Sequence, residues 1–252
     1  MEALEFAAIG AAGIAAGGIN AVVGSGTLIT FPTLLALGYP AVVANVSNNI
    51  GLVPGALSAV HGYRRELKGQ RNRLIRWGAG SFLGGLTGAL LLLALPDKTF
   101  DAVVPVLIII ACVLLLLQPR LNRWMKERQS SGRRQDGGVP MWCGVLGTGV
   151  YGGYFGAAQG VLLMGLFGSF LQDDLQRLNA AKNVLSAIVN GVAAVVFIAV
   201  ADVDWAVAGV IAAGSILGGA LGARVGRRLS PTVLRGVIIT VGVTAAILMT
   251  VR

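Results

Sequence analysis

The sequence predicts an all-α polytopic membrane protein made of two inverted-topology repeats, each with about five hydrophobic segments. Three observations support this fold class: an apolar composition, an internal duplication, and a reversal of loop charge between the two copies. Of the 252 residues, 55% are hydrophobic and only 12% are charged, and the mean hydropathy is +0.77. Water-soluble domains carry about a quarter of their residues as charges, so this composition argues against a soluble fold.

Long stretches without charge define the predicted segments. No Asp, Glu, Lys or Arg occurs in the 58 residues between Glu5 and Arg64. A membrane-spanning helix needs about 20 apolar residues, so this stretch holds two or three segments. The ten predicted segments are 3–23, 26–38, 41–61, 77–96, 100–118, 140–158, 160–172, 177–200, 205–224 and 231–251.

The chain contains a duplicated unit. A shift of 134 positions aligns Gly80–Ala89 with Gly214–Ala223, and seven of these ten positions are identical. The same shift pairs Asn45 with Asn179 and Asn49 with Asn183, which is informative because asparagine is uncommon in apolar segments. Secondary transporters are often built from such repeats. The predicted units are a first repeat at 1–118, a basic cytoplasmic linker at 119–139 and a second repeat at 140–252.

Loop charges indicate how the two copies are oriented. The stretches 62–76 and 120–140 carry net charges of +5 and +4, so the positive-inside rule makes both cytoplasmic. In the second copy, the counterpart of 62–76 is acidic and contains Asp202 and Asp204. The counterpart of the outer hairpin 96–101 is the basic stretch 224–231. This reversal predicts an upside-down second copy, an odd number of crossings per copy, and external termini.

Two predicted segments are too short to span a membrane. Segments 26–38 and 160–172 hold 13 residues each, which cover about 20 Å of a roughly 30 Å hydrocarbon core. We therefore expect half-helices. If each instead re-entered on the same side, the chain would have eight full spans and Arg224 would face outside, against the charge rule.

These short segments indicate where a substrate would bind. Short, interrupted segments at corresponding places in two inverted halves mark the midplane site of a transporter. Glycines at 24, 26 and 160 permit a broken backbone, whose free N–H groups at a helix N-terminus attract an anion. Ser25, Thr27 and Gln159 add hydrogen-bonding side chains. The alternative role for these glycines is close helix packing.

Polar side chains follow each break. Asn45, Asn48 and Asn49 lie on one apolar segment, and Asn179, Asn183 and Asn190 lie on its counterpart. Their alternative role is interhelical hydrogen bonding. Lys182 is the only Lys or Arg between Leu178 and Ala223, and an intramembrane cation suggests a counter-charge for an anionic substrate. Its alternative is a lysine that snorkels to the interface. The predicted substrate-binding residues are Gly24, Ser25, Gly26, Thr27, Asn45, Asn48, Asn49, Gln159, Gly160, Asn179, Lys182 and Asn183.

Other chemistries find no support in the sequence. No catalytic constellation, metal-ligand cluster or cofactor motif occurs, so we predict neither an enzyme nor a cofactor or metal site. Cys112 and Cys143 are expected to be small core residues, and His61 an interfacial residue rather than a proton relay. The net charge of +9 would suggest nucleic acid in a soluble protein. Here the cations lie between hydrophobic segments, so nucleic-acid binding is rejected.

The run from Gly24 to Leu35, followed by Gly38-Tyr39-Pro40 and 44–48, resembles the first-half signature of the sulfite exporter TauE/SafE family, also called the toluene sulfonate uptake permease family. Residues 152–156 and 182–185 look like its second-half counterpart. The resemblance implies a prokaryotic inner-membrane permease, without ATP hydrolysis, for sulfite, sulfonates or related anions. The family usually shows three consecutive glycines near both breaks. Here the triplets read Gly-Ser-Gly at 24–26 and Ala-Gln-Gly at 158–160.

We therefore expect a secondary transporter for a small anion, in the cell inner membrane of a prokaryote. The expected partners are the anion and the lipid bilayer. Coupling to a proton or ion gradient and assembly into a homo-oligomer are both compatible with the sequence. The alternatives are a carrier for a cation or neutral metabolite, a membrane-embedded enzyme and a non-transporting scaffold.

Overall fold

The computed structural model describes residues 3–128 and 137–225, and within them the chain is all helical. The helices of the first half are α1 (Ala3–Val22), α2 (Thr27–Ala36), α3 (Ala41–Gly62), α4 (Arg71–Ala94) and α5 (Asp97–Arg128). Those of the second half are α6 (Gly138–Tyr154), α7 (Gln159–Phe170), α8 (Leu175–Val200) and α9 (Trp205–Val225). These nine match the first nine predicted segments. The predicted segment 231–251 lies outside the described residues.

Five of the described helices are long and apolar enough to cross a membrane: α1, α4, α5, α8 and α9. The short helices α2 and α7, of 10 and 12 residues, are the predicted half-helices. α5 continues to Arg128, so the predicted linker at 119–139 begins inside a helix. α4 begins at Arg71, before the apolar segment, because the basic residues 71–76 add further helical turns.

Glycines and a capping carboxylate set several helix boundaries. Gly24, Gly38 and Gly156 have positive φ angles of 85°, 90° and 75°, which non-glycine residues rarely adopt, and each lies just after a helix or in a break. α8 begins where the Asp174 side chain accepts hydrogen bonds from the backbone N–H groups of Gln176 and Arg177.

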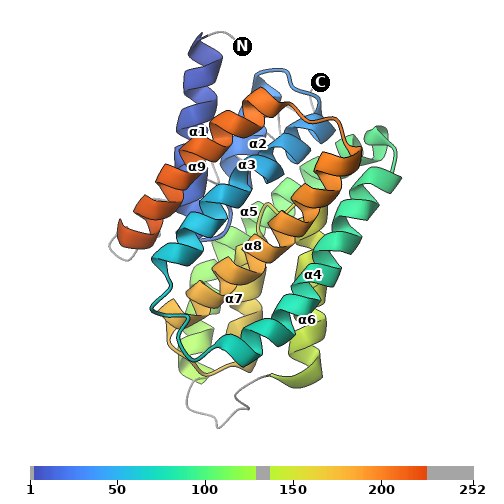
Figure 1. The fold of residues 1–252 in the computed structure, drawn as a ribbon. Helices are drawn as coiled ribbons and strands as arrows, with labels where there is room; N and C mark the ends of the chain where they lie inside the picture. The colour runs from blue at the N-terminus through green and yellow to red at the C-terminus, as the bar shows by residue number, and fades with distance from the viewer. Residues whose placement is uncertain (1–2, 129–136, 226–252) are drawn as a thin grey trace.

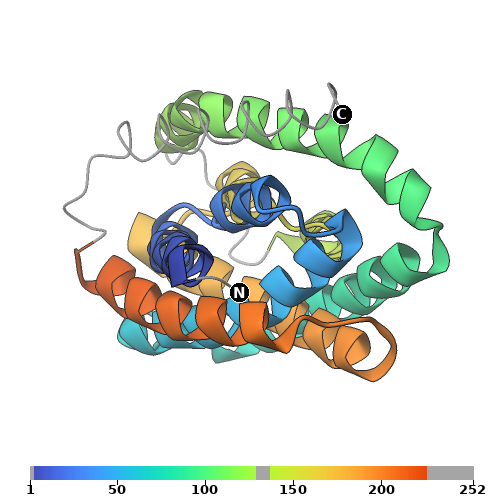
Figure 2. The ribbon, with the colours of Figure 1, turned by 90° about the horizontal axis from the view of Figure 1, so that it is seen from above.

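α1 with α2, and α6 with α7, form two helical hairpins that turn back inside the protein (Figures 1 and 2). In the second hairpin, a Cβ on Gly152 would meet Gln159, and one on Gly137 would meet Phe170, so α7 runs back along α6. In the first hairpin, a Cβ on Gly26 would lie 2.4 Å from the Ala16 carbonyl oxygen, so the start of α2 lies beside α1. Each short helix therefore folds back against the helix that precedes it.

The bundle has two chemically different ends. At the acidic end, the backbone N–H of Asp204 donates to Ser47 Oγ at 2.9 Å. At the same end, burial, and then the charges of Asp204 and Glu5, raise the pKa of Tyr39. At the basic end, Tyr63, Ala180 and Ala223 pack together, so α3 and α9 end where α8 begins.

Candidate functional site

The two chain breaks meet inside the bundle, at Gly24 and Gly160. The Gly160 N–H donates to the Gly24 carbonyl at 3.1 Å. A Cβ on either glycine would lie 2.4 Å from the Cα of the other, a distance at which backbone would have to move. Only glycine at both positions allows the breaks this close an approach.

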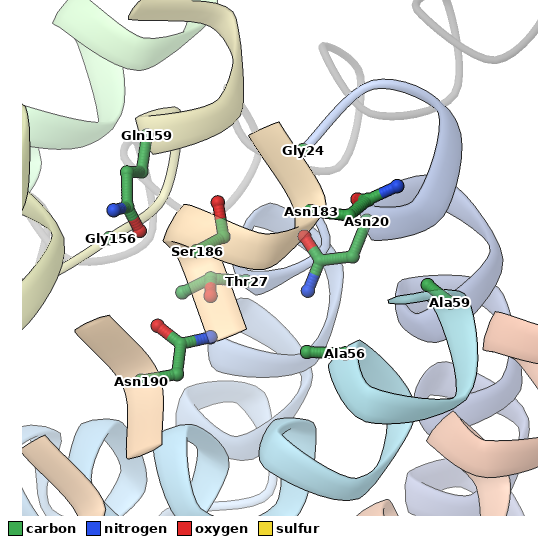
Figure 3. A pocket seen from close by; sticks show the side chains of 10 residues that line it. All are labelled: Asn20, Gly24, Thr27, Ala56, Ala59, Gly156, Gln159, Asn183, Ser186 and Asn190. Carbon is green, nitrogen blue, oxygen red and sulfur yellow. The ribbon is translucent and has the colours of Figure 1, made fainter. Parts of the chain in front are cut away.

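A small cavity lies beside this contact (Figure 3). Its volume is about 20 Å³, room for about one water molecule. The side chains drawn as sticks in Figure 3 come from the two hairpins and also from helices α3 and α8. The lining residues are Asn20, Gly24, Thr27, Ala56, Ala59, Gly156, Gln159, Asn183, Ser186 and Asn190.

One wall of the cavity is polar and the opposite wall is apolar. On α8, Asn183, Ser186 and Asn190 have helical spacing i, i+3 and i+7, so they form one stripe. On α3, the lining residues are Ala56 and Ala59. The two repeats therefore contribute unequally, and α8 alone supplies three of the six hydrogen-bonding side chains of the lining.

Two helices begin at the cavity. α2 starts at Thr27 and α7 starts at Gln159, and neither N-cap residue, Gly26 or Ala158, caps its helix with its own side chain. A helix N-terminus carries about half a positive charge from its aligned peptide dipoles. The Gly160 N–H at the start of α7 is already bonded to the Gly24 carbonyl, so the dipoles, and not free N–H groups, provide the positive potential there. Gln159 is only 4% exposed, and its amide Nε2 has no hydrogen-bond partner within the described chain. The same holds for Ser186 Oγ. The cavity thus presents unused donors to whatever occupies it.

The buried C-terminus of α1 is capped by side chains of α8. Lys182 Nζ donates to the carbonyls of Asn20 at 3.0 Å and Ala21 at 3.4 Å. Asn179 and Asn183 each donate an amide N–H to the Ala21 carbonyl at 3.1 Å. Lys182 is 0% exposed, so it does not snorkel to an interface. A cation at a helix C-terminus is favourable, because it complements the negative end of the dipole.

The first repeat uses the corresponding positions in a similar way. Asn45 donates to the Tyr154 carbonyl at the end of α6, at 3.1 Å. Asn48, which aligns with Lys182, donates to Thr27 Oγ1 at 3.3 Å and accepts a hydrogen bond from Thr30. These side chains thus fix the start of α2 and the end of α6.

Of the twelve predicted site residues, Gly24, Thr27, Gln159 and Asn183 line the cavity. Gly26, Gly160, Asn48, Asn179 and Lys182 hold the breaks in place, as described above and by the hydrogen bond from Gly26 N–H to Asn20 Oδ1 at 2.7 Å. Ser25, Asn45 and Asn49 are also outside the lining. A direct role for these eight in binding remains a prediction.

Six lining residues were not predicted: Asn20, Ala56, Ala59, Gly156, Ser186 and Asn190. Asn190 is recognisable in the sequence as a polar residue of an apolar segment, but it is not among the predicted site residues. Its spacing from Asn183 and Ser186 was a usable signal. No sequence signal distinguishes Ala56 and Ala59 from the other alanines of an apolar helix, because only the packing of the helices determines which alanines line the cavity.

A polar network closes the basic end, between the two repeats. Asp173 pairs with Arg73, and with Arg177 at 2.9 Å. Gln70 links the same elements by donating to the Arg177 carbonyl at 3.1 Å. Burial alone would raise the pKa of Asp173, but its hydrogen bonds and the charges of Arg73 and Arg177 lower that pKa overall. Beneath the network, Trp77 and Phe167 stack with ring centroids 5.4 Å apart.

The helical bundle with two interior hairpins defines the class of protein: a polytopic membrane protein with a small central cavity lined by both polar and apolar residues. The chain belongs to the family described as Sulfite exporter TauE/SafE, whose family model matches residues 9–249. The resemblance found from the sequence is therefore confirmed. No solved structure matches the chain.

Curated relatives bear names of the same kind. The chain is 28% identical over 228 residues to the Escherichia coli (strain K12) "Probable membrane transporter protein YfcA", covering 90% of this chain and 82% of the relative. A "Probable membrane transporter protein" of Haemophilus influenzae is 28% identical over 233 residues, with coverage of 90% and 87%. A relative from Sinorhizobium sp is 25% identical over 232 residues, with coverage of 92% and 87%. These findings confirm a multi-pass membrane transporter and not an enzyme.

Proposed function

We propose that this transporter carries a small anion, which binds in the central cavity between two inverted repeats. The proposed anion is sulfite, an organosulfonate, or a related sulfur-containing or organic acid anion. One observation carries the anionic character: the positive ends of α2 and α7 converge on a cavity that is also lined by Gln159, whose amide Nε2 has no partner within the described chain.

The chemistry of the lining supports an anion over a cation. None of the residues lining the cavity is acidic, and the amide and hydroxyl side chains there can donate hydrogen bonds. The ammonium of Lys182 lies next to this lining, on the carbonyl of Asn20. A cation would be repelled by the positive ends of two helix dipoles. An oxyanion would accept hydrogen bonds from the same groups.

The helix pairings support the inverted arrangement. Under the duplication α1 corresponds to α6, and α9 to α4. Contacts of Gly13 with Ile211 and of Gly17 with Ser215 make α1 and α9 parallel neighbours. Contacts of Gly84 with Gly149 and of Gly88 with Gly153 do the same for α4 and α6. Figure 1 draws these two pairs running in opposite directions, as two repeats related by an axis in the membrane plane would run.

The substrate class rests on two supports. The family is described as Sulfite exporter, and the relatives are named only as probable membrane transporters. The cavity, at about 20 Å³, must expand to admit any of the proposed anions. Small, compact oxyanions require the least expansion, which favours sulfite and short sulfonates over larger organic acids.

Flux into proteoliposomes tests the proposal. We expect uptake of labelled sulfite or a short sulfonate by vesicles containing the protein, and competition by the unlabelled anion. A panel with thiosulfate, small carboxylates and a neutral analogue of similar size, each with and without a pH gradient, separates charge from size and reports proton coupling. Transport of the neutral analogue at the same rate as the anions would overturn the anion assignment.

A further inference from the structure

A second recess lies at the basic end of the bundle, between α3 and α9. We call it the basic groove; it has a volume of about 500 Å³ and is lined by Ser58, His61, Gly62, Arg64, Arg65, Ala220, Ala223 and Arg224. Its floor is made of small residues, because a Cβ on Gly62 would lie 2.3 Å from the Cβ of Ala223. Its rim carries three arginines and a histidine, all exposed.

The basic groove faces away from the central cavity. On α3, the cavity is lined by Ala56 and Ala59, whereas the groove is lined by Ser58, His61 and Gly62. At about 100° per residue, Ser58 and His61 point about 140–200° away from Ala56 around the helix. The groove therefore opens on the outer surface of the bundle, and Figure 2 shows α9 on that outer side.

Exposed apolar side chains continue the groove along the membrane-facing surface. On α9, Leu217, Leu221 and Arg224 have the spacing i, i+4 and i+7, so two leucines lead to the arginine on one face. These leucines are 58% and 54% exposed. On α3, Leu57 is 57% exposed and lies four residues before His61. A cationic rim with leucines directly above it matches a headgroup with its acyl chains.

We propose that the basic groove binds an anionic phospholipid, with the phosphate at Arg64, Arg65 and Arg224 and the acyl chains over Leu57, Leu217 and Leu221. Basic pockets between helices on the cytoplasmic side of a membrane suit anionic headgroups. Arg64 is already oriented by its hydrogen bond to the His61 carbonyl, at 3.1 Å. The groove joins α3 to α9, so the lipid would hold together elements from the two repeats. This inference does not depend on the transported substrate.

The test compares lipids and variants of the full chain in nanodiscs. Phosphatidylcholine discs with and without phosphatidylglycerol are compared by thermal unfolding, and retained lipid is counted by native mass spectrometry. We expect phosphatidylglycerol to raise the unfolding temperature and to remain bound. Inorganic phosphate and glycerol 3-phosphate, added to phosphatidylcholine discs, should not reproduce the shift, because they lack acyl chains.

Matched variants separate a site from a general attraction to negative membranes. Arg64→Gln/Arg224→Gln removes one cation from each side of the groove, and each loss should weaken binding about five-fold. Lys68→Gln/Arg71→Gln removes the same charge from exposed residues at the same end that do not line the groove. Ala220→Phe keeps every cation but fills the groove, and should also displace the lipid.

Three results would overturn the proposal. Equal losses in the two double variants would mean that only the surface potential attracts the lipid. A full shift with inorganic phosphate alone would identify a site for soluble anions. Retention of phosphatidylglycerol by Ala220→Phe, in folded protein, would place the lipid elsewhere.

Discussion

Gly24 and Gly160 bring the two halves of the protein into backbone contact, at a hydrogen bond of 3.1 Å from the Gly160 N–H to the Gly24 carbonyl. The contact fixes the start of α7 against the end of the first break, and the cavity opens beside it. The position of the proposed anion site is therefore set by two residues that lack side chains.

Gly160→Ala should destabilise the protein by about 1–3 kcal/mol, because its Cβ would lie 2.4 Å from the Gly24 Cα. Gly191→Ala is the matched control: Gly191 is also helical, and a Cβ there meets nothing within 4 Å. The control should be neutral or more stable, by up to about 1 kcal/mol. Thermal unfolding in detergent measures both. Similar unfolding temperatures for the two variants would contradict the close approach.

Gln159→Met should reduce anion affinity about tenfold or more, because it removes a donor to a charged ligand while keeping the side-chain length. Gln159→Glu should abolish binding, since it places a negative charge between two helix N-termini that already attract the substrate. Gln172→Met is the control, at an exposed position outside the cavity. Substrate competition in proteoliposomes gives the affinities. Unchanged affinity in Gln159→Met would remove this amide from the site.

The fold was largely predictable from the sequence, whereas the partners of individual residues were not. Charge-free length located nine described segments, and the short length of 26–38 and 160–172 predicted the half-helices because helix rise per residue is constant. Pairing of Gly24 with Gly160 was not predictable, since any glycine in an apolar run can serve close packing. The acceptors of Lys182 are backbone carbonyls of α1, and no local pattern indicates which carbonyls a helix leaves free inside a bundle.

Asp173→Asn should lower the unfolding temperature by weakening the links to Arg73 and Arg177. The pKa of Asp173 is lowered in the folded protein from its ordinary value of 3.8. The carboxylate therefore stabilises the fold fully above that ordinary value and loses this effect as the pH falls through the lowered pKa. The wild type and the variant should differ at neutral pH and converge in acid. Asp202→Asn, at an exposed carboxylate, should show no such convergence.

Cysteine labelling tests the two ends of the bundle. In a background with the exposed Cys143 changed to Ser, Asp202→Cys should react with an impermeant maleimide added outside intact cells. Lys68→Cys should react only after permeabilisation, because the positive-inside rule makes the basic end cytoplasmic. Labelling of both from one side would contradict the fold itself. An exchange of the two accessibilities would leave the fold intact and contradict only its orientation.

Lys182 variants separate helix capping from anion binding. Lys182→Met removes the donor to the Asn20 carbonyl and should cost about 1–3 kcal/mol, the usual penalty for a buried unsatisfied group. The Ala21 carbonyl would be less affected, because Asn179 and Asn183 also donate to it. Lys182→Gln keeps a donor without the charge and should recover much of the stability.

Transport measurements on the same variants show whether the positive charge of Lys182 takes part in anion binding. If the ammonium is the counter-charge for the anion, folded Lys182→Gln should lose most transport, while Lys182→Arg should keep part of it because the charge survives with altered geometry. Unfolding temperature and flux, measured on the same preparations, distinguish the two roles. Wild-type flux and affinity in a stable Lys182→Gln would show that Lys182 only caps α1, and the anion would then be bound by the helix N-termini and the Gln159 amide alone.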